Sequence, residues 1–397
     1  MKRYTSFYLF VLLSVIFFVF RKWFIHPEII GGDWPYYYED FLKNFSLVPV
    51  IWQPWMGNGL GGVQPLLGLH LFSSIIIVPF TQWLGIPWNI VYKVGWFGLF
   101  IALSIYGSKK LWEVTDNREQ RAEGFPWWMV ASLVYTTNTY ILMVTGGGQM
   151  GVALAYSIAP FVLASFIKLY ESVYTPLSVV IPAQAGIQSG SPIRSGMTKC
   201  AVVAGLVLGF QVMIDPRIAY GTMVGVGLYV IANSKWQIAN VISTLVVPLV
   251  IAAGVNAFWV IPMAVMKNNP LESLGSAYTS IDALKFYSFA DFSHALSLLH
   301  PNWPENVFGK TFFLQPEFVI IPLIAFASLL FIGQRADSKK QIVFFSILAL
   351  IGAFLAKVAQ EPFRSVYQWM FTHVPGFVMF RDPTKWYVLV ALGNSVL

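Results

Sequence analysis

Charge is scarce in this chain, and so is cysteine. Only 11% of the 397 residues are charged, whereas 57% are hydrophobic; a soluble globular chain is about a quarter charged. The single cysteine, Cys200, excludes an intrachain disulfide and leaves no Cys-x-x-Cys motif for metal or redox chemistry. The basic residues are scattered between apolar runs rather than gathered on one face, which argues against a nucleic-acid partner. The composition predicts an all-α, polytopic protein embedded in the lipid bilayer.

Apolar runs that approach the length of a bilayer crossing recur along the chain. A crossing helix needs about 20 mostly apolar residues. The candidate spans are Tyr4–Phe20, Ile90–Leu111, Trp127–Val144, Met150–Leu169, Ala201–Ile214, Ile218–Ile231, Ile238–Met266, Phe318–Gly333 and Ile342–Ala356. One more begins near Trp386, too close to the end of the chain to cross, so we expect a truncated C-terminus. The sequence predicts one membrane domain over residues 1–397, a transmembrane helical bundle of about nine or ten spans.

The lysines and arginines indicate the orientation of these spans. With the N-terminus in the cytosol, basic loops such as Lys109–Arg121 and Arg335–Lys340 lie inside, as the positive-inside rule expects. The first span is followed by "RKWF" and no small-residue cleavage pattern, so we expect it to be retained. We predict a multi-pass protein of a bacterial-type cytoplasmic (inner) membrane. The external regions are residues 21–89, 267–317 and 357–385, with a short turn at Ile214–Arg217.

Two stretches depart from the pattern of spans. Leu69–Pro87 has a continuous apolar core of about ten to twelve residues, which is short for a span. We expect it to form an interfacial or re-entrant helix within the large first external loop, residues 21–89. The stretch 174–199 is rich in Gly, Ser, Pro and Ala and has neither helical nor strand periodicity, so we expect an inserted cytosolic linker.

The first external loop contains a cluster of acids in a chain that has few. "HPEIIGGDWPYYYEDF" carries Glu28, Asp33, Glu39 and Asp40 among only 18 acidic residues. Almost no charge lies within the spans, which argues against an ion-coupled transporter. External acidic and aromatic loops suit an enzyme whose substrate lies in the lipid. Sugar transfer from a polyprenyl phosphate needs one carboxylate as a base, because phosphate is a good leaving group, whereas a glycoside hydrolase needs two.

Cations and aromatic rings near this loop suggest how such a substrate is held. External cations that can bind the donor phosphate are Arg217, Arg381 and Lys385. Aromatic side chains that can stack on a sugar or contact the acceptor are Trp34, Tyr36, Tyr37, Trp52 and Trp55.

Each of these candidates also has a purely structural interpretation. Asp33 could cap a helix or pair with Arg21 or Lys22. Glu39 and Asp40 fit the wet side of an amphipathic surface helix. Arg381 and Asp382 could form a local ion pair that caps the last helix, and Arg217 could be a turn residue.

Two motifs in these regions resemble a known family. Gly32-Asp33, Trp52–Pro54, Gly57–Gly59 and Val78–Phe80 resemble the first external loop of GT-C-type glycosyltransferases, in particular YfhO-type bacterial membrane proteins and the N-terminal domain of arabinofuranosyltransferases. The late stretch "HVPGFVMFRDPTKW" is similar to a "PGF…FR-x-P" stretch of the same proteins.

The resemblance implies a GT-C-like fold and a role in building the cell envelope. It implies inverting transfer of a sugar from a polyprenyl-phosphate donor to an envelope glycan or lipid acceptor on the outer face. Asp33 would be the catalytic base, with Glu39 and Asp40 as secondary acids. Whether a divalent metal takes part stays open. The alternative function is a lipid-linked glycan transporter or a non-catalytic envelope assembly factor.

Overall fold

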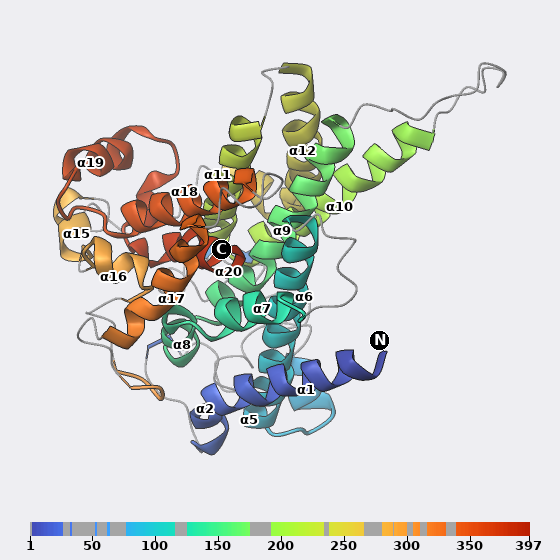
Figure 1. Ribbon diagram of the computed structural model, residues 1–397, viewed down its shortest axis with the longest axis vertical. Helices are drawn as coiled ribbons and strands as arrows, with labels where there is room; N and C mark the ends of the chain where they lie inside the picture. The colour runs from blue at the N-terminus through green and yellow to red at the C-terminus, as the bar shows by residue number, and fades with distance from the viewer. Residues whose placement is uncertain are drawn as a thin grey trace.

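The computed structural model describes residues 2–26, 32–33, 52–53, 62–63, 77–115, 125–174, 192–233, 238–265, 280–288, 290–299, 305–309, 316–330 and 339–397. Within these ranges the chain forms sixteen α-helices. Two short strands, β1 (Trp52–Gln53) and β2 (Gly62–Val63), pair antiparallel. The predicted all-α class is therefore confirmed for the described residues (Figure 1).

The helices of the first half of the chain are α1 (Lys2–Val19), α2 (Arg21–Ile25), the π-helix η3 (Pro79–Trp83), α5 (Trp88–Ile90), the π-helix η4 (Val91–Trp96), α6 (Phe97–Thr115), α7 (Trp128–Thr137), α8 (Thr139–Gly146) and α9 (Met150–Tyr174). Those of the second half are α10 (Pro192–Ile214), α11 (Pro216–Asn233), α12 (Ile238–Val265), α15 (Ile281–Phe286), α16 (Phe292–Leu296), α17 (Pro316–Ala327), α18 (Lys339–Ala356), α19 (Arg364–His373), the 3-10 helices η7 (Phe377–Phe380) and η8 (Pro383–Trp386), and α20 (Tyr387–Val396).

Several of these helices have the length and composition of membrane spans. Within the described ranges, four are long and apolar enough to cross a bilayer: Trp88–Thr115, Met150–Val173, Thr244–Pro262 and Lys339–Ala356. Shorter apolar helices cover Ser6–Val19, Thr198–Ile214 and Val319–Leu330. A membrane location is therefore plausible for the chain.

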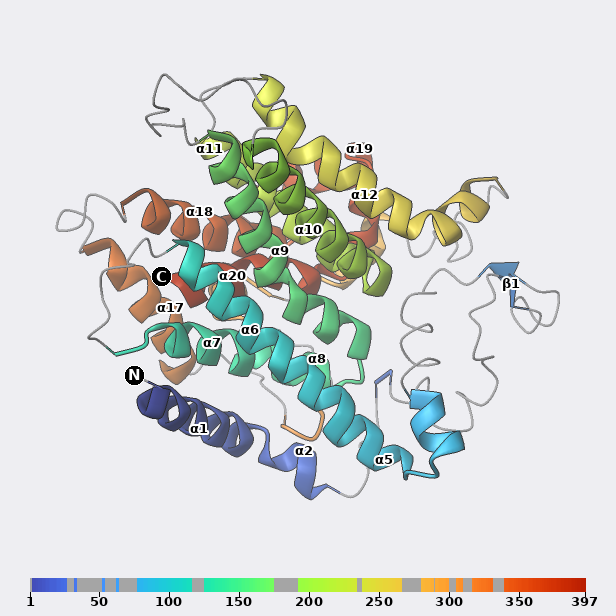
Figure 2. The ribbon, with the colours of Figure 1, turned by 90° about the vertical axis from the view of Figure 1, so that its right-hand side faces the viewer.

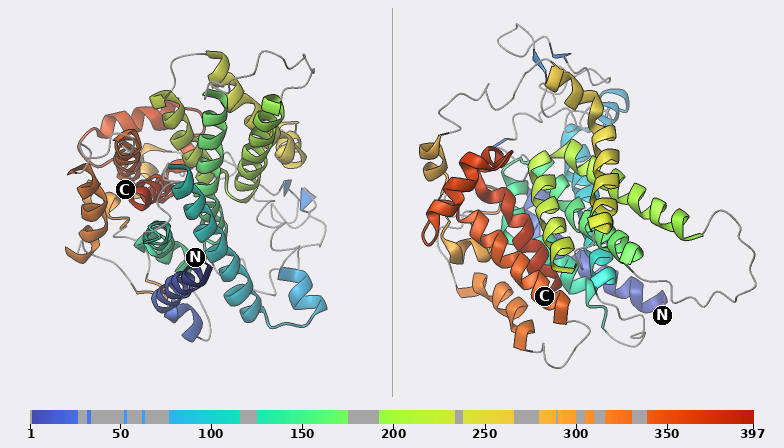
Figure 3. Two further views of the ribbon diagram at one scale, coloured as in Figure 1. Left: turned by 45° about the vertical axis from the view of Figure 1, so that its right-hand side comes forward. Right: turned by 90° about the horizontal axis from the view of Figure 1, so that it is seen from above.

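Helix α9 lies at the centre of the bundle and packs against α6, α10 and α11 (Figure 2). Its apolar window Met150–Val173 is almost entirely covered by other helices, whereas Thr244–Pro262 of α12 is largely uncovered. Helix α12 packs along α10, and α18 packs along α20 (Figure 3). The C-terminal helix α20 is buried from Tyr387 to Ser395. Residues of α1, at the start of the chain, and of α20, at its end, therefore belong to the same hydrophobic core.

One expected span is wrong. The apolar run Trp127–Val144 is broken into α7 and α8 at Asn138, whose backbone is extended, with φ −70° and ψ 163°. The Asn138 side chain caps α8 by accepting a hydrogen bond from the Ile141 N–H at 3.1 Å, as Asn does at a helix N-terminus. Its amide donates to the Tyr156 hydroxyl at 2.8 Å, which ties the break to α9. Neither half is long enough to cross a bilayer alone.

Two other boundaries differ from expectation. Helix α10 begins at Pro192, so the end of the predicted linker 174–199 is helical rather than irregular. Proline is well suited to the first turn of a helix, because its missing N–H has no partner there in any case. Within Leu69–Pro87, the chain is helical from Ile77 to Trp83 and irregular from Leu84 to Pro87, and residues 69–76 lie outside the described residues. Helix α17 continues as a 3-10 turn to Leu330, and the last three residues of the predicted span Phe318–Gly333 lie outside the described residues.

Candidate functional site

Asp33 is attached to the bundle by its backbone. Its N–H donates to the carbonyl of Gly147, in the turn between α8 and α9, at 2.9 Å. The preceding residue, Gly32, has φ +57°, and a Cβ placed there would lie 2.2 Å from the Gly147 oxygen. Only glycine allows the backbone at position 32 to come this close to the Gly147 carbonyl. The glycine of the "GD" pair is therefore required by a close contact between the first loop and the α8–α9 turn.

A buried lysine lies beside this turn. Lys385 in η8 is 1% exposed, and its Nζ donates to Gln149 Oε1 at 3.0 Å, Asp382 Oδ2 at 2.6 Å and Thr384 Oγ1 at 3.2 Å. A lysine ammonium has three protons, and these three acceptors match them. Gln149 directly precedes α9 and lies two residues after Gly147, so Lys385 joins the C-terminal segment to the same turn that binds Asp33.

Asp382 organises the short helix that carries this lysine. Its Oδ1 accepts hydrogen bonds from the Thr384 N–H at 3.1 Å and the Thr384 hydroxyl at 2.7 Å. Its other carboxylate oxygen takes the Lys385 ammonium. Asp382 therefore caps η8, the short helix that directly precedes the last helix, and forms an ion pair with Lys385.

The turn between α10 and α11 contributes a bidentate ion pair. Arg217 Nε and Nη2 donate to the two oxygens of Asp215 at 3.1 and 2.7 Å. Asp215 also accepts from the backbone N–H groups of Arg217 and Ile218, which caps α11. The Asp215 side chain is 3% exposed and that of Arg217 is 32% exposed. Arg217 is therefore a turn residue whose remaining nitrogen, Nη1, makes no hydrogen bond to the residues that the structure describes.

These groups share one electrostatic environment. Asp33 is exposed, yet loss of hydration is the largest effect on its carboxyl and raises its pKa above the ordinary 3.8; Lys385, Arg217 and a hydrogen bond from Gln149 oppose this rise, and Asp382 adds to it. For Asp215 burial acts in the same direction, but the Arg217 guanidinium outweighs it and lowers the pKa. Asp33 is thus a carboxylate of increased basicity close to two cations.

Three of the predicted site residues interact electrostatically, because Lys385 and Arg217 both act on the Asp33 carboxyl. The Arg381 guanidinium lies 5.9 Å from the centre of the Tyr287 ring. Arg21, an alternative partner of Asp33, donates instead to the Phe18 carbonyl at 3.0 Å. Most of the remaining predicted residues lie outside the described part of the chain: Trp34, Tyr36, Tyr37, Glu39, Asp40 and Trp55. Trp52 belongs to strand β1, but its side chain is not described.

Sequence reasoning did not identify Gln149, Asp215 and Asp382 as members of this site. Gln149 follows a Gly-rich turn and had no charge to single it out. Asp215 and Asp382 each precede a proline, a pattern typical of a helix start, and their partners are two and three residues further on. The pairs could therefore be found from local spacing, whereas the contact of Lys385 with Gln149 joins residues far apart in the chain.

Within the described ranges, no group of three or more His, Cys, Asp or Glu side chains is placed to hold a metal ion.

Comparison with known proteins identifies no relative: no family model, curated protein or solved structure matches the chain significantly. The function must therefore be argued from the site alone.

Proposed function

We propose that the protein is a membrane glycosyltransferase of GT-C type that moves a sugar from a polyprenyl phosphate to an envelope glycan or lipid. The observation that carries this proposal is the position of Asp33 near two cations. The carboxylate, Arg217 and Lys385 come from three distant segments, all predicted to be external. A single base close to positive charge is the set of groups that this transfer needs.

In the proposed reaction, Asp33 accepts the proton of the acceptor hydroxyl as its oxygen attacks the anomeric carbon. The bond from that carbon to the phosphate oxygen breaks, and the electron pair leaves with the polyprenyl phosphate. One displacement inverts the anomeric centre. The raised pKa of Asp33 favours proton uptake, because a base is more effective as its pKa approaches the working pH.

The two cations have different parts in this proposal. Lys385 is buried and its three protons already have acceptors, so it acts on the leaving phosphate through its fixed charge and not by contact. Arg217 is partly exposed and keeps Nη1 for a phosphate oxygen while Asp215 holds its other side. Arg217 is therefore the direct phosphate ligand in the proposed site.

The first test is Asp33→Asn, assayed with a panel of radiolabelled undecaprenyl-phosphate-linked hexoses and pentoses in native membranes. Removing a general base lowers the rate by about 10²- to 10⁴-fold. Asp282→Asn is the matched control, since Asp282 is 92% exposed in the same predicted external face and takes no part in the site. Full transfer by a folded, inserted Asp33→Asn protein would reject the mechanism and favour a transporter or assembly factor.

A second test separates phosphate binding from folding. Arg217→Lys keeps the charge beside Asp215 but loses the bidentate geometry and the free nitrogen. We expect a rise in KM for the polyprenyl-phosphate sugar of about tenfold, which equals 1.4 kcal/mol, with kcat changed less. An unchanged KM would remove Arg217 from the proposed donor site.

A further inference from the structure

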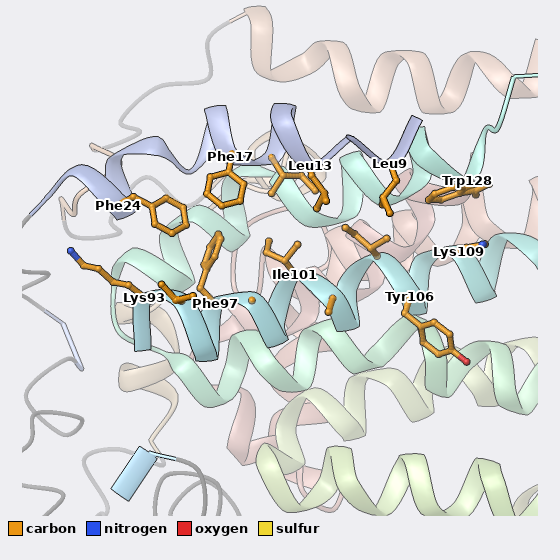
Figure 4. Close-up of a pocket in the computed structure, with 15 residues that line it drawn as sticks. Leu9, Leu13, Phe17, Phe24, Lys93, Phe97, Ile101, Tyr106, Lys109 and Trp128 are labelled. Atoms are coloured by element: carbon orange, nitrogen blue, oxygen red, sulfur yellow. The ribbon is translucent and has the colours of Figure 1, made fainter. Parts of the chain in front are cut away.

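A long apolar groove separates α1 from α6. Its volume is about 690 Å³, and its wall is formed mainly by Leu13, Phe17, Phe97 and Ile101 (Figure 4). Lys93 lies at one end, and Lys109 lies with Trp128 at the other. The groove therefore combines a continuous apolar wall with a cation at each end. It is lined by none of the residues of the Asp33 site.

The groove is open to the surroundings of the bundle. Phe17 is 55% exposed and Tyr106 is 48% exposed on its two walls. A Cβ built on Gly98, which lies in the wall, would meet no heavy atom within 4 Å. Space thus remains in the groove beside α6, within the segment Trp88–Thr115 that is long and apolar enough to cross a membrane.

The two lysines are not equivalent. Lys93 is 9% exposed and its Nζ already donates to the carbonyl of His26. Lys109 is 39% exposed, with its Nζ 4.9 Å from the centre of the Trp128 ring and 3.9 Å from Glu113, whose carboxylate is closer to Lys110 at 2.7 Å. An exposed lysine beside a tryptophan at the end of an apolar helix suits the headgroup region of a bilayer. An anionic group would therefore bind at the Lys109 end.

We infer that the groove holds one acyl chain of an anionic phospholipid whose phosphate lies at Lys109. The charge at this end favours a negative headgroup, and the apolar wall favours a hydrocarbon chain. By the predicted orientation, the lipid belongs to the cytosolic leaflet. This inference is independent of the proposed function.

The test measures which lipid stays bound to the full chain after extraction in mild detergent. The protein is equilibrated with vesicles of equal parts phosphatidylglycerol, phosphatidylcholine and undecaprenyl phosphate, and retained lipid is counted by mass spectrometry. We expect one phosphatidylglycerol per protein. Equal retention of phosphatidylcholine, or preferential retention of undecaprenyl phosphate, would overturn the inference.

Two pairs of variants locate the bound lipid. Gly98→Phe fills the groove and should abolish retention, whereas Gly95→Phe, at an exposed helical glycine that does not line the groove, should preserve it. Lys109→Gln should reduce the preference for phosphatidylglycerol at least tenfold, whereas Lys340→Gln, at an exposed lysine that does not line the groove, should not. Lys109→Gln affects a side chain that is 39% exposed and keeps the test decisive even if Gly98→Phe fails to fold; an unchanged preference in this variant would reject the inference.

Discussion

At the scale of single residues, Gly32 is the site position where a side chain would clash most directly with the backbone. Its φ is +57°, and an added Cβ would approach the Gly147 oxygen to 2.2 Å. Gly32→Ala should therefore separate Asp33 from the α8–α9 turn. Because a displacement of about 1 Å can cost on the order of 10²-fold in rate, we expect a loss of that order in transfer activity. Thermal unfolding in detergent should show the accompanying loss of stability.

Gly85 provides the matched control for this substitution. It also has a positive φ, +63°, but a Cβ built there would meet nothing within 4 Å. Gly85→Ala carries only the cost of the left-handed backbone, about 1–2 kcal/mol, and should keep its transfer activity. If both variants lost the same activity, the contact between Gly32 and Gly147 would have no special role.

The pKa of Asp33 predicts a pH dependence. Loss of hydration raises this pKa above 3.8, so the base is lost by protonation as the pH falls through the raised value. Gln149→Leu removes a hydrogen bond that lowers the pKa and should move the acidic limb of kcat/KM to higher pH. Gln211→Leu removes a buried amide that binds Ala155 and Thr222 and should leave the limb in place. A shift to lower pH in Gln149→Leu would contradict the assignment of Asp33.

At the scale of helices, the packing of α18 against α20 depends on two glycines. A Cβ on Gly393 would lie 2.6 Å from that of Ala349, and one on Gly352 would lie 2.8 Å from that of Leu389. Gly393→Ala should force the helices apart at a cost of about 1–3 kcal/mol, the usual range for overpacking. The free energy of unfolding, measured with denaturant in detergent, should fall accordingly.

Gly227 in α11 tests whether helix propensity alone explains such changes. A Cβ there would meet nothing within 4 Å. Gly227→Ala should therefore stabilise the protein by about 0.5–1 kcal/mol, as alanine does in a helix interior. The two substitutions should have opposite signs, and a stabilising Gly393→Ala would show that α20 is not held closely against α18.

The same scale shows what the sequence could predict. Hydropathy located the cores of α9, α12 and α18 well, because long apolar runs identify such helices directly. It did not locate the break at Asn138, because the run around this residue remains apolar on average while its side chain caps α8. At the site, the family resemblance selected Asp33 among the four acids, and residue chemistry selected the cations Arg217, Arg381 and Lys385. The bond between Lys385 and Gln149 depends on tertiary packing and could not be read from local spacing.

At the scale of the whole molecule, orientation is the property to test. In a Cys200→Ala background, His26→Cys and Lys340→Cys place single thiols at exposed positions on opposite predicted sides. A membrane-impermeant maleimide added to intact cells should label His26→Cys and not Lys340→Cys. Labelling should reach Lys340→Cys only after the membrane is permeabilised. The reverse pattern would invert the orientation and place the Asp33 site in the cytosol.

The three acceptors around Lys385 have a consequence for how the site responds to a substrate. An ammonium that is held on every side by Gln149, Asp382 and Thr384 cannot turn toward an arriving phosphate. Its positive charge is already oriented when the protein has folded, and no solvent or side chain needs to reorganise around it later. The free energy needed to orient this charge is therefore spent when the protein folds. In the proposed reaction, each catalytic cycle would begin with the charge already oriented.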